Sequence, residues 1–220
     1  MKRILLVMTI LSVSVFSTAC ISNFAIKELN NKAQAYLSNG DVDSAICRLK
    51  SSLDLDSELY ETHYNLAVAY LAADNQLDAI DSLKRVVQLK PDYNDAYYSL
   101  GVANSTLAYK TLDMENSENE DGSRYELTPE EKQALNIYLN EAVDNYNRYL
   151  SNAPKAENAD EIKNQIEQLS QLLKERSEQM REQPQEEDEE EYNYEEDSHD
   201  EYFDGEGDEE GNFEDYSEEE

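Results

Sequence analysis

The clearest signal of secondary structure is in Tyr60–Tyr93, YETHYNLAVAYLAADNQLDAIDSLKRVVQLKPDY. Its apolar residues recur three or four positions apart, and residues at that spacing share one face of a helix. Pro91 ends the second group because proline cannot continue an interior hydrogen-bond ladder. The stretch therefore predicts a hairpin of two helices, whose inward residues are Leu66, Ala67 and Tyr70 on the first helix and Ala79, Leu83 and Val86 on the second.

The same pattern recurs at an interval of 34 residues on both sides of this stretch. One step forward, Leu66 and Ala67 correspond to Leu100 and Gly101. One step back, the corresponding pairs are Tyr70 and Tyr36, Ala79 and Ala45, Ile80 and Ile46, Leu83 and Leu49, and Leu89 and Leu55. Each hairpin exposes an apolar flank that only the next hairpin can cover, so the pattern predicts a stack of hairpins.

The residues of this repeat resemble the tetratricopeptide-repeat (TPR) family, most closely in Tyr60–Tyr93. His63 stands where the family often has Trp, and Leu66-Ala67 replaces Leu-Gly. Tyr70, Ala79, Leu83, Val86 and Pro91 follow at the family's spacing. The resemblance covers about residues 26 to 154. It implies an all-α fold, a short right-handed α–α superhelix of TPR-like helical hairpins closed by a C-terminal capping helix.

The repeats fall at about 26–59, 60–93 and 94–154 within a helical domain of 24–182. The third repeat has 38 positions from Asn104 to Ala142, whereas the second repeat has nine from Tyr70 to Ala79. About 29 residues are therefore inserted, at about 105–139. Thr128-Pro129-Glu130-Glu131 is a capping box with Pro at the first helical position, so we expect a helix from near Pro129 to about Leu150. An amphipathic segment at about 156–182 predicts the capping helix.

The resemblance also implies where a partner binds. In TPR proteins the first helices of the hairpins make an inner wall that contacts peptide segments or other proteins. Tyrosine suits such a wall because it offers a large contact area and a polar tip. The alternative, that some of these tyrosines only pack, stays open. The matching wall positions are Asn30, Gln34, Leu37, Tyr64, Asn65, Val68, Leu71, Tyr98, Ser99 and Val102.

One activity of the family is not expected here. Chaperone-binding members clamp a C-terminal carboxylate with Lys, Arg and Asn side chains. Asn65 matches one clamp position, but Asn30, Gln34, Asp95 and Ser99 stand at the others. Without a cationic side chain at these positions, a carboxylate has no charge-assisted partner.

Nothing in the sequence predicts an enzyme, a cofactor or a metal centre. Two Cys and two His are too few for a disulfide framework or a zinc cluster. There is no nucleophile elbow and no phosphate loop. We expect His63 to be a packing residue, and Cys47 to be a small hydrophobe on a helix.

The charge is strongly negative and unevenly placed. The 220 residues hold 50 acids and 18 bases, a net charge of −32. The last 38 residues, 183–220, carry 21 acids and no Lys or Arg, which leaves −11 for residues 1–182. This field repels nucleic acids. We expect 183–220 to be a disordered acidic tail. Three roles for this tail remain open: a solvated segment that prevents self-association, capture of a basic partner, and weak binding of divalent cations.

The N-terminus has the pattern of a signal peptide, residues 1–19. Basic Lys2-Arg3 precedes the apolar run 4–16, which is too short to span a bilayer. Ser17-Thr18-Ala19-Cys20 resembles the lipobox of bacterial lipoproteins, which implies lipid attachment at Cys20 and a tether of residues 20–23. Ser17 departs from the usual Leu, so ordinary cleavage after Ala19 is the alternative.

These observations predict a membrane-anchored protein–protein interaction scaffold of the bacterial cell envelope. Ile21 follows Cys20, which by resemblance to enteric lipoproteins favours the outer membrane. The alternative is a soluble periplasmic or secreted acidic protein whose tail binds basic proteins or divalent cations.

Overall fold

The computed structural model describes residues 23–119 and 121–182, and most of these are helical. Residues 23–38 are helical, and an isolated antiparallel bridge joins Glu118 and Arg124. No strand occurs in the described part, so the prediction of an all-α fold is confirmed. The following helices are α2 (Val42–Leu55), α3 (Tyr60–Ala72), α4 (Gln76–Leu89), α5 (Asn94–Glu115), α6 (Pro129–Asn152) and α7 (Ala159–Glu182).

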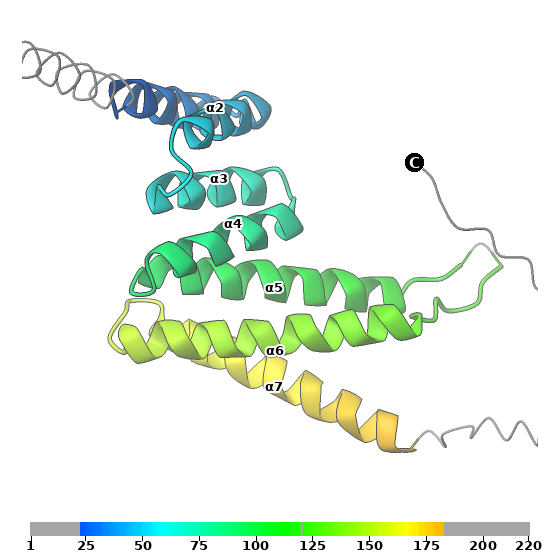
Figure 1. Ribbon diagram of the computed structural model, residues 1–220. Helices are drawn as coiled ribbons and strands as arrows, with labels where there is room; N and C mark the ends of the chain where they lie inside the picture. Colours follow the sequence, from blue (N-terminus) through cyan, green and yellow to red (C-terminus); the bar gives the residue numbers. More distant parts are fainter. Residues whose placement is uncertain (1–22, 120, 183–220) are drawn as a thin grey trace, which may run out of the picture. The chain divides into compact units, whose positions relative to one another are not determined.

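The helices pack on their neighbours in sequence, as Figure 1 shows for α2 to α7. Alanines on facing helices let the backbones approach, and leucines fill the space beside them. One core cluster runs from Ala33 on the first helix to Ala103 on α5. A second one joins the end of α5, α6 and α7 around Leu135, Leu139 and Leu169. The apolar pattern at intervals of 34 therefore lies inside the stack.

The turn between the two helices of a hairpin also repeats after 34 residues. Gly40 (φ 78°) and Asp74 (φ 58°) both adopt the left-handed conformation that ends a helix. The side chains of the next residues, Asp41 and Asn75, cap α2 and α4 by accepting hydrogen bonds from backbone N–H groups. The corresponding residue of the third repeat, Ala108, is fully buried within α5. α5 therefore continues to Glu115.

The stretch expected as an insertion, 105–139, lengthens two helices. Its first part belongs to α5, its last part belongs to α6, and a connecting segment, 116–128, joins them. At the start of α6, Thr128 and Glu131 form a reciprocal capping box, in which the Glu131 carboxylate accepts from the Thr128 N–H at 2.8 Å. Leu127 is buried beside this cap. The insertion therefore builds a long α5–α6 hairpin.

α7 packs against α6 and ends the described stack. Its buried residues Ile162 and Leu169 belong to the second core, whereas Glu167 and Gln171 are exposed. This polar outer side suits a terminal helix. No described helix is long and apolar enough to span a bilayer. The predictions for residues 1–19, Cys20, most of the tether 20–23 and the tail 183–220 lie outside the described residues.

Candidate functional site

A hollow of about 310 Å³ lies between the helix 23–38 and α3, with Leu49 of α2 buried beneath it. These two helices are the first helices of adjacent hairpins, so their inward faces meet here. Asn31, Ala33 and Leu49 line the hollow although sequence reasoning did not select them. Five of the ten predicted wall residues line it as well: Asn30, Gln34, Leu37, Asn65 and Val68.

The lining combines amide and aliphatic side chains. Asn31, Gln34 and Asn65 are exposed and can donate and accept hydrogen bonds. Leu37 and Val68 add apolar surface. None of the eight lining residues carries a charge at neutral pH. The hollow can therefore hold an uncharged segment through hydrogen bonds and nonpolar contacts.

Asn30 has a different role from the predicted one. Its Nδ2 lies within hydrogen-bonding distance of the carbonyl oxygen of Ile26 (3.0 Å), of Ser52 Oγ (2.9 Å) and of Thr62 Oγ1 (3.2 Å). Its Oδ1 accepts from Asn65 Nδ2 at 3.4 Å. Ser52 and Thr62 are buried on α2 and α3. The Asn30 amide thus joins three helices, and its hydrogen-bonding groups are already used inside the fold.

Tyr64 and Tyr98 occupy corresponding positions, 34 residues apart, on α3 and α5. The Tyr64 ring lies edge-on to Tyr93, with 5.0 Å between ring centroids. The Tyr98 ring lies 5.4 Å from that of Tyr149, and 37% of Tyr98 is exposed. Neither the Tyr64 nor the Tyr98 hydroxyl has a hydrogen-bond partner among the described residues. Each ring is thus supported on one side and keeps a free hydroxyl.

The neighbouring tyrosines, Tyr60, Tyr146 and Tyr149, use their hydroxyl groups for contacts within the fold. The Tyr60 hydroxyl accepts from Lys90 Nζ at 2.8 Å, and this hydrogen bond raises the pKa of Lys90. The Tyr149 hydroxyl donates to the side chain of Asn158. Burial raises the pKa of Tyr146 to about 12, and its hydroxyl lies 3.3 Å from Ser105 Oγ, within hydrogen-bonding distance. The polar tips of these rings are therefore not free for a partner.

The other predicted wall residues lie outside the hollow. Leu71 is half-buried and packs against the first core, and Val102 packs against the second. Ser99 is only 7% exposed, which differs from the expectation that it faces a partner. The equivalent residue of the second repeat, Asn65, is exposed, so the position within the repeat does not by itself decide the burial of Ser99.

Three residues outside the wall can also be placed. Asn31 could have been found from helix periodicity, because it lies three positions before Gln34 on the same helix face. His63 is half-buried, and its Nε2 lies 3.0 Å from the carbonyl oxygen of Ser57. Cys47 lies on a helix, α2, as expected, and its side chain is exposed. Its neighbours Ile46 and Leu49 take the inward positions of that helix.

No three His, Cys, Asp or Glu side chains converge as metal ligands within residues 23–119 and 121–182. No protein-family model matches the sequence, and neither does any curated protein. Solved structures do match. The TPR domain of P58(IPK) superimposes with a TM-score of 0.53 at 18% identity, over 71% of this chain and 35% of that one. The chain has the TPR fold.

Two further TPR structures agree with this assignment. The MamA protein matches with a TM-score of 0.51 and 22% identity, over 74% of this chain and 73% of that one. The second TPR domain of human RPAP3, in complex with the HSP70 peptide SGPTIEEVD, matches with a TM-score of 0.50 and 15% identity. The match covers 68% of this chain and 98% of that one. At these identities the similarity concerns the fold alone.

Proposed function

We propose that this protein is an interaction scaffold that holds a peptide segment of a partner protein in the hollow and against Tyr64 and Tyr98. The observation that carries the proposal is the hollow itself, which opens between the first helices of two TPR hairpins and is lined by exposed amides beside aliphatic side chains. The RPAP3 domain, which is in complex with a peptide, supports the idea that such hairpins can bind a peptide segment.

The chemistry of the hollow favours an uncharged segment. Three of the last four residues of the peptide bound by the RPAP3 domain, SGPTIEEVD, are acidic. Here, no lining residue of the hollow is cationic, and residues 1–182 carry a net charge of −11. An acidic peptide would meet repulsion without a charge-assisted hydrogen bond to offset it. Gln34 and Asn65 can instead bond to peptide backbone groups, and Leu37 and Val68 can contact an apolar side chain.

A peptide selected from a random library against the full chain tests this proposal. Replacing Tyr64 or Tyr98 by Ala should weaken binding about tenfold or more, since a central aromatic contact dominates such interfaces. Leu77→Ala and Ile137→Ala are matched controls, because these apolar residues are 57% and 51% exposed on the second helices, α4 and α6. The controls should bind as the unchanged protein does. If they lose affinity and the tyrosine variants keep it, the proposal is wrong.

We also propose that the scaffold is anchored to a bacterial envelope membrane through a lipid on Cys20. The support is the lipobox-like sequence. Two or three acyl chains give stable membrane binding, whereas one gives only marginal binding. The four residues from Cys20 to Asn23 span about 14 Å at most. The first hairpin would then stay close to the bilayer surface.

Cell fractionation tests the anchor. Cys20→Ser should move the protein from the membrane to the soluble fraction. Cys47→Ser is the matched control and should leave the protein in the membrane fraction, since Cys47 lies on the surface of α2. Retention of Cys20→Ser in membranes would refute the lipid anchor, and a soluble unchanged protein would favour the secreted alternative.

A further inference from the structure

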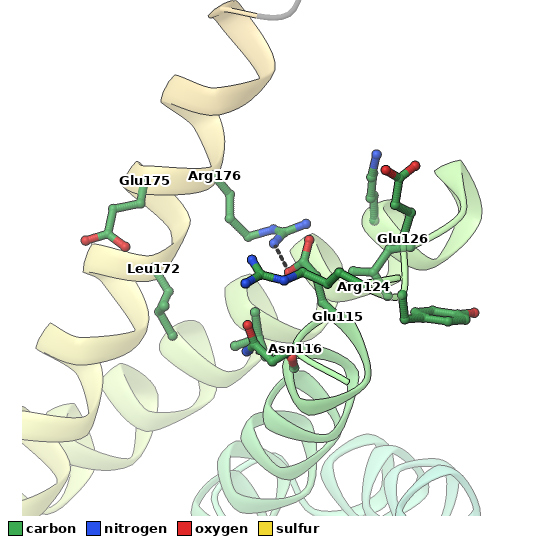
Figure 2. A pocket seen from close by; sticks show the side chains of 11 residues that line it. Glu115, Asn116, Arg124, Glu126, Leu172, Glu175 and Arg176 are labelled. Carbon is green, nitrogen blue, oxygen red and sulfur yellow. Dashed lines mark hydrogen bonds and ion pairs between the residues drawn. The ribbon is translucent and has the colours of Figure 1, made fainter. Parts of the chain in front are cut away.

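Figure 2 shows a second, larger hollow, of about 490 Å³, which shares no lining residue with the first hollow. It opens between the end of α5, the connecting segment 116–128, the first turn of α6 and α7. Leu112, Leu127 and Leu172 give it an apolar part. Its cationic lining residues come from three different elements: Arg124 from the connecting segment, Lys132 from α6 and Arg176 from α7.

Arg176 is the most buried of these cations. Its side chain is 12% exposed, and Nη1 donates to Glu115 Oε2 at 2.9 Å. Its Nε is buried and finds no acceptor within the described residues. A buried donor without a partner costs free energy, and the Arg176 guanidinium lacks an acceptor for its Nε–H group.

The other two cations have no ion pair within the described part of the chain. In Figure 2 the side chains of Arg124 and Arg176 both run toward Glu115, whereas Glu126 and Glu175 point away from them. Glu175 instead accepts a hydrogen bond from Gln171. The centre of the hollow thus holds two guanidinium groups and one carboxylate. The excess is confined to this centre, because the whole lining has three cations and three carboxylates, the latter from Glu115, Glu126 and Glu175.

We propose that this hollow binds a small carboxylate with an apolar body. A carboxylate matches the planar donor fork of a guanidinium group, and it would neutralise the excess charge of the Arg124 and Arg176 pair. The three leucines would cover the apolar part of the ligand. The volume lies within the range of small-molecule sites.

Calorimetric titration of the full chain with octanoate tests this inference, with octylamine and octanol as probes of the same length and different charge. Octanoate should bind saturably, and the other two should bind at least about tenfold more weakly. Arg124→Gln should weaken octanoate binding about tenfold or more, since charged hydrogen bonds are the strong ones. Arg48→Gln is the matched control, because Arg48 is exposed on α2 and has no ion pair in the described part.

Three results would overturn the proposal: no octanoate binding, equal binding of octanol, or unchanged affinity of Arg124→Gln. Inorganic phosphate that competes as well as octanoate would show a simple anion site and would remove the apolar part of the claim. Arg124 has no ion pair to lose, so its variant should keep the circular dichroism of the unchanged chain. That measurement separates loss of binding from loss of folding.

Discussion

At the scale of single residues, Asn30 ties the first described helix to α2 and α3. The residues in corresponding positions of the next repeat are Tyr64, Val86 and Ala96, in place of Asn30, Ser52 and Thr62. The polar network therefore belongs to the first junction alone. A buried network of this kind stabilises one arrangement when every member is paired, and it is costly when one member is missing.

Asn30→Ala should lower the free energy of unfolding by about 1–3 kcal/mol, because it leaves the buried hydroxyls of Ser52 and Thr62 without their partner. Urea denaturation measures the change. Asn31→Ala is the control, since Asn31 is exposed next to it and makes no hydrogen bond with its side chain in the described part. That variant should stay within about 0.5 kcal/mol of the unchanged protein. Equal losses in both would contradict the role given to Asn30.

Gly101 and Tyr146 are a matched pair in the third repeat. Earlier repeats have Ala33 and Ala67 at the position of Gly101, and leucines at the position of Tyr146. A Cβ on Gly101 would lie 2.5 Å from Cδ1 of the Tyr146 ring. The larger residue on α6 is therefore accommodated by the smaller one on α5.

Gly101→Ala should destabilise the protein by about 1–3 kcal/mol through overpacking. Alanine is favoured over glycine in a free helix by about 1 kcal/mol, so the sign of the change is diagnostic. Ala67→Gly, the reverse change in the second repeat, should cost about 1 kcal/mol. Thermal unfolding of the two variants gives the comparison, and a more stable Gly101→Ala protein would rule out the close contact.

Part of this detail could be predicted from the sequence. Alanines and leucines at intervals of 34 predict which side chains pack, because packing within a hairpin is local. The Asn30 network was not predictable, since its partners lie 22 and 32 residues away and depend on how two hairpins stack. The same stacking turns Ser99 inward, although its position in the repeat favoured the wall.

At the scale of elements, the start and the length of the α5–α6 hairpin have different origins. The start of α6 is a local signal, Thr128-Pro129 with Glu131, and the sequence therefore predicts it. The extension of α5 follows from a missing signal, because Ala108 replaces the left-handed turn residue of the earlier repeats. An insertion count alone does not say whether added residues form a loop or extend a helix.

Thr128→Ala should remove the side-chain cap of α6 and cost about 1 kcal/mol. The backbone N–H of Glu131 then loses its acceptor, so amide hydrogen exchange should rise in the first turn of α6. Thr111→Ala is the control, because the Thr111 hydroxyl bonds only within α5. Unchanged exchange in the first turn of α6 would show that the buried Leu127, rather than the cap, holds this end.

At the scale of the whole molecule, the stack has two cores and one wall whose surface chemistry is uncharged. The 34-residue period predicts the stack. Half of the wall residues that the resemblance implies line one hollow. The remaining wall residues pack into the cores or against other tyrosines. The second hollow was not predictable, because its cations come together only when α7 closes over the α5–α6 hairpin.

The most direct test of the wall as a peptide site is nuclear magnetic resonance of side-chain amides during titration with the selected peptide. The account predicts that the NH₂ signals of Asn31, Gln34 and Asn65 shift in parallel with binding. The signals of Gln168 and Gln171, exposed on α7, should not move. Shifts confined to α7, with the three amides of the first hollow unchanged, would contradict the account.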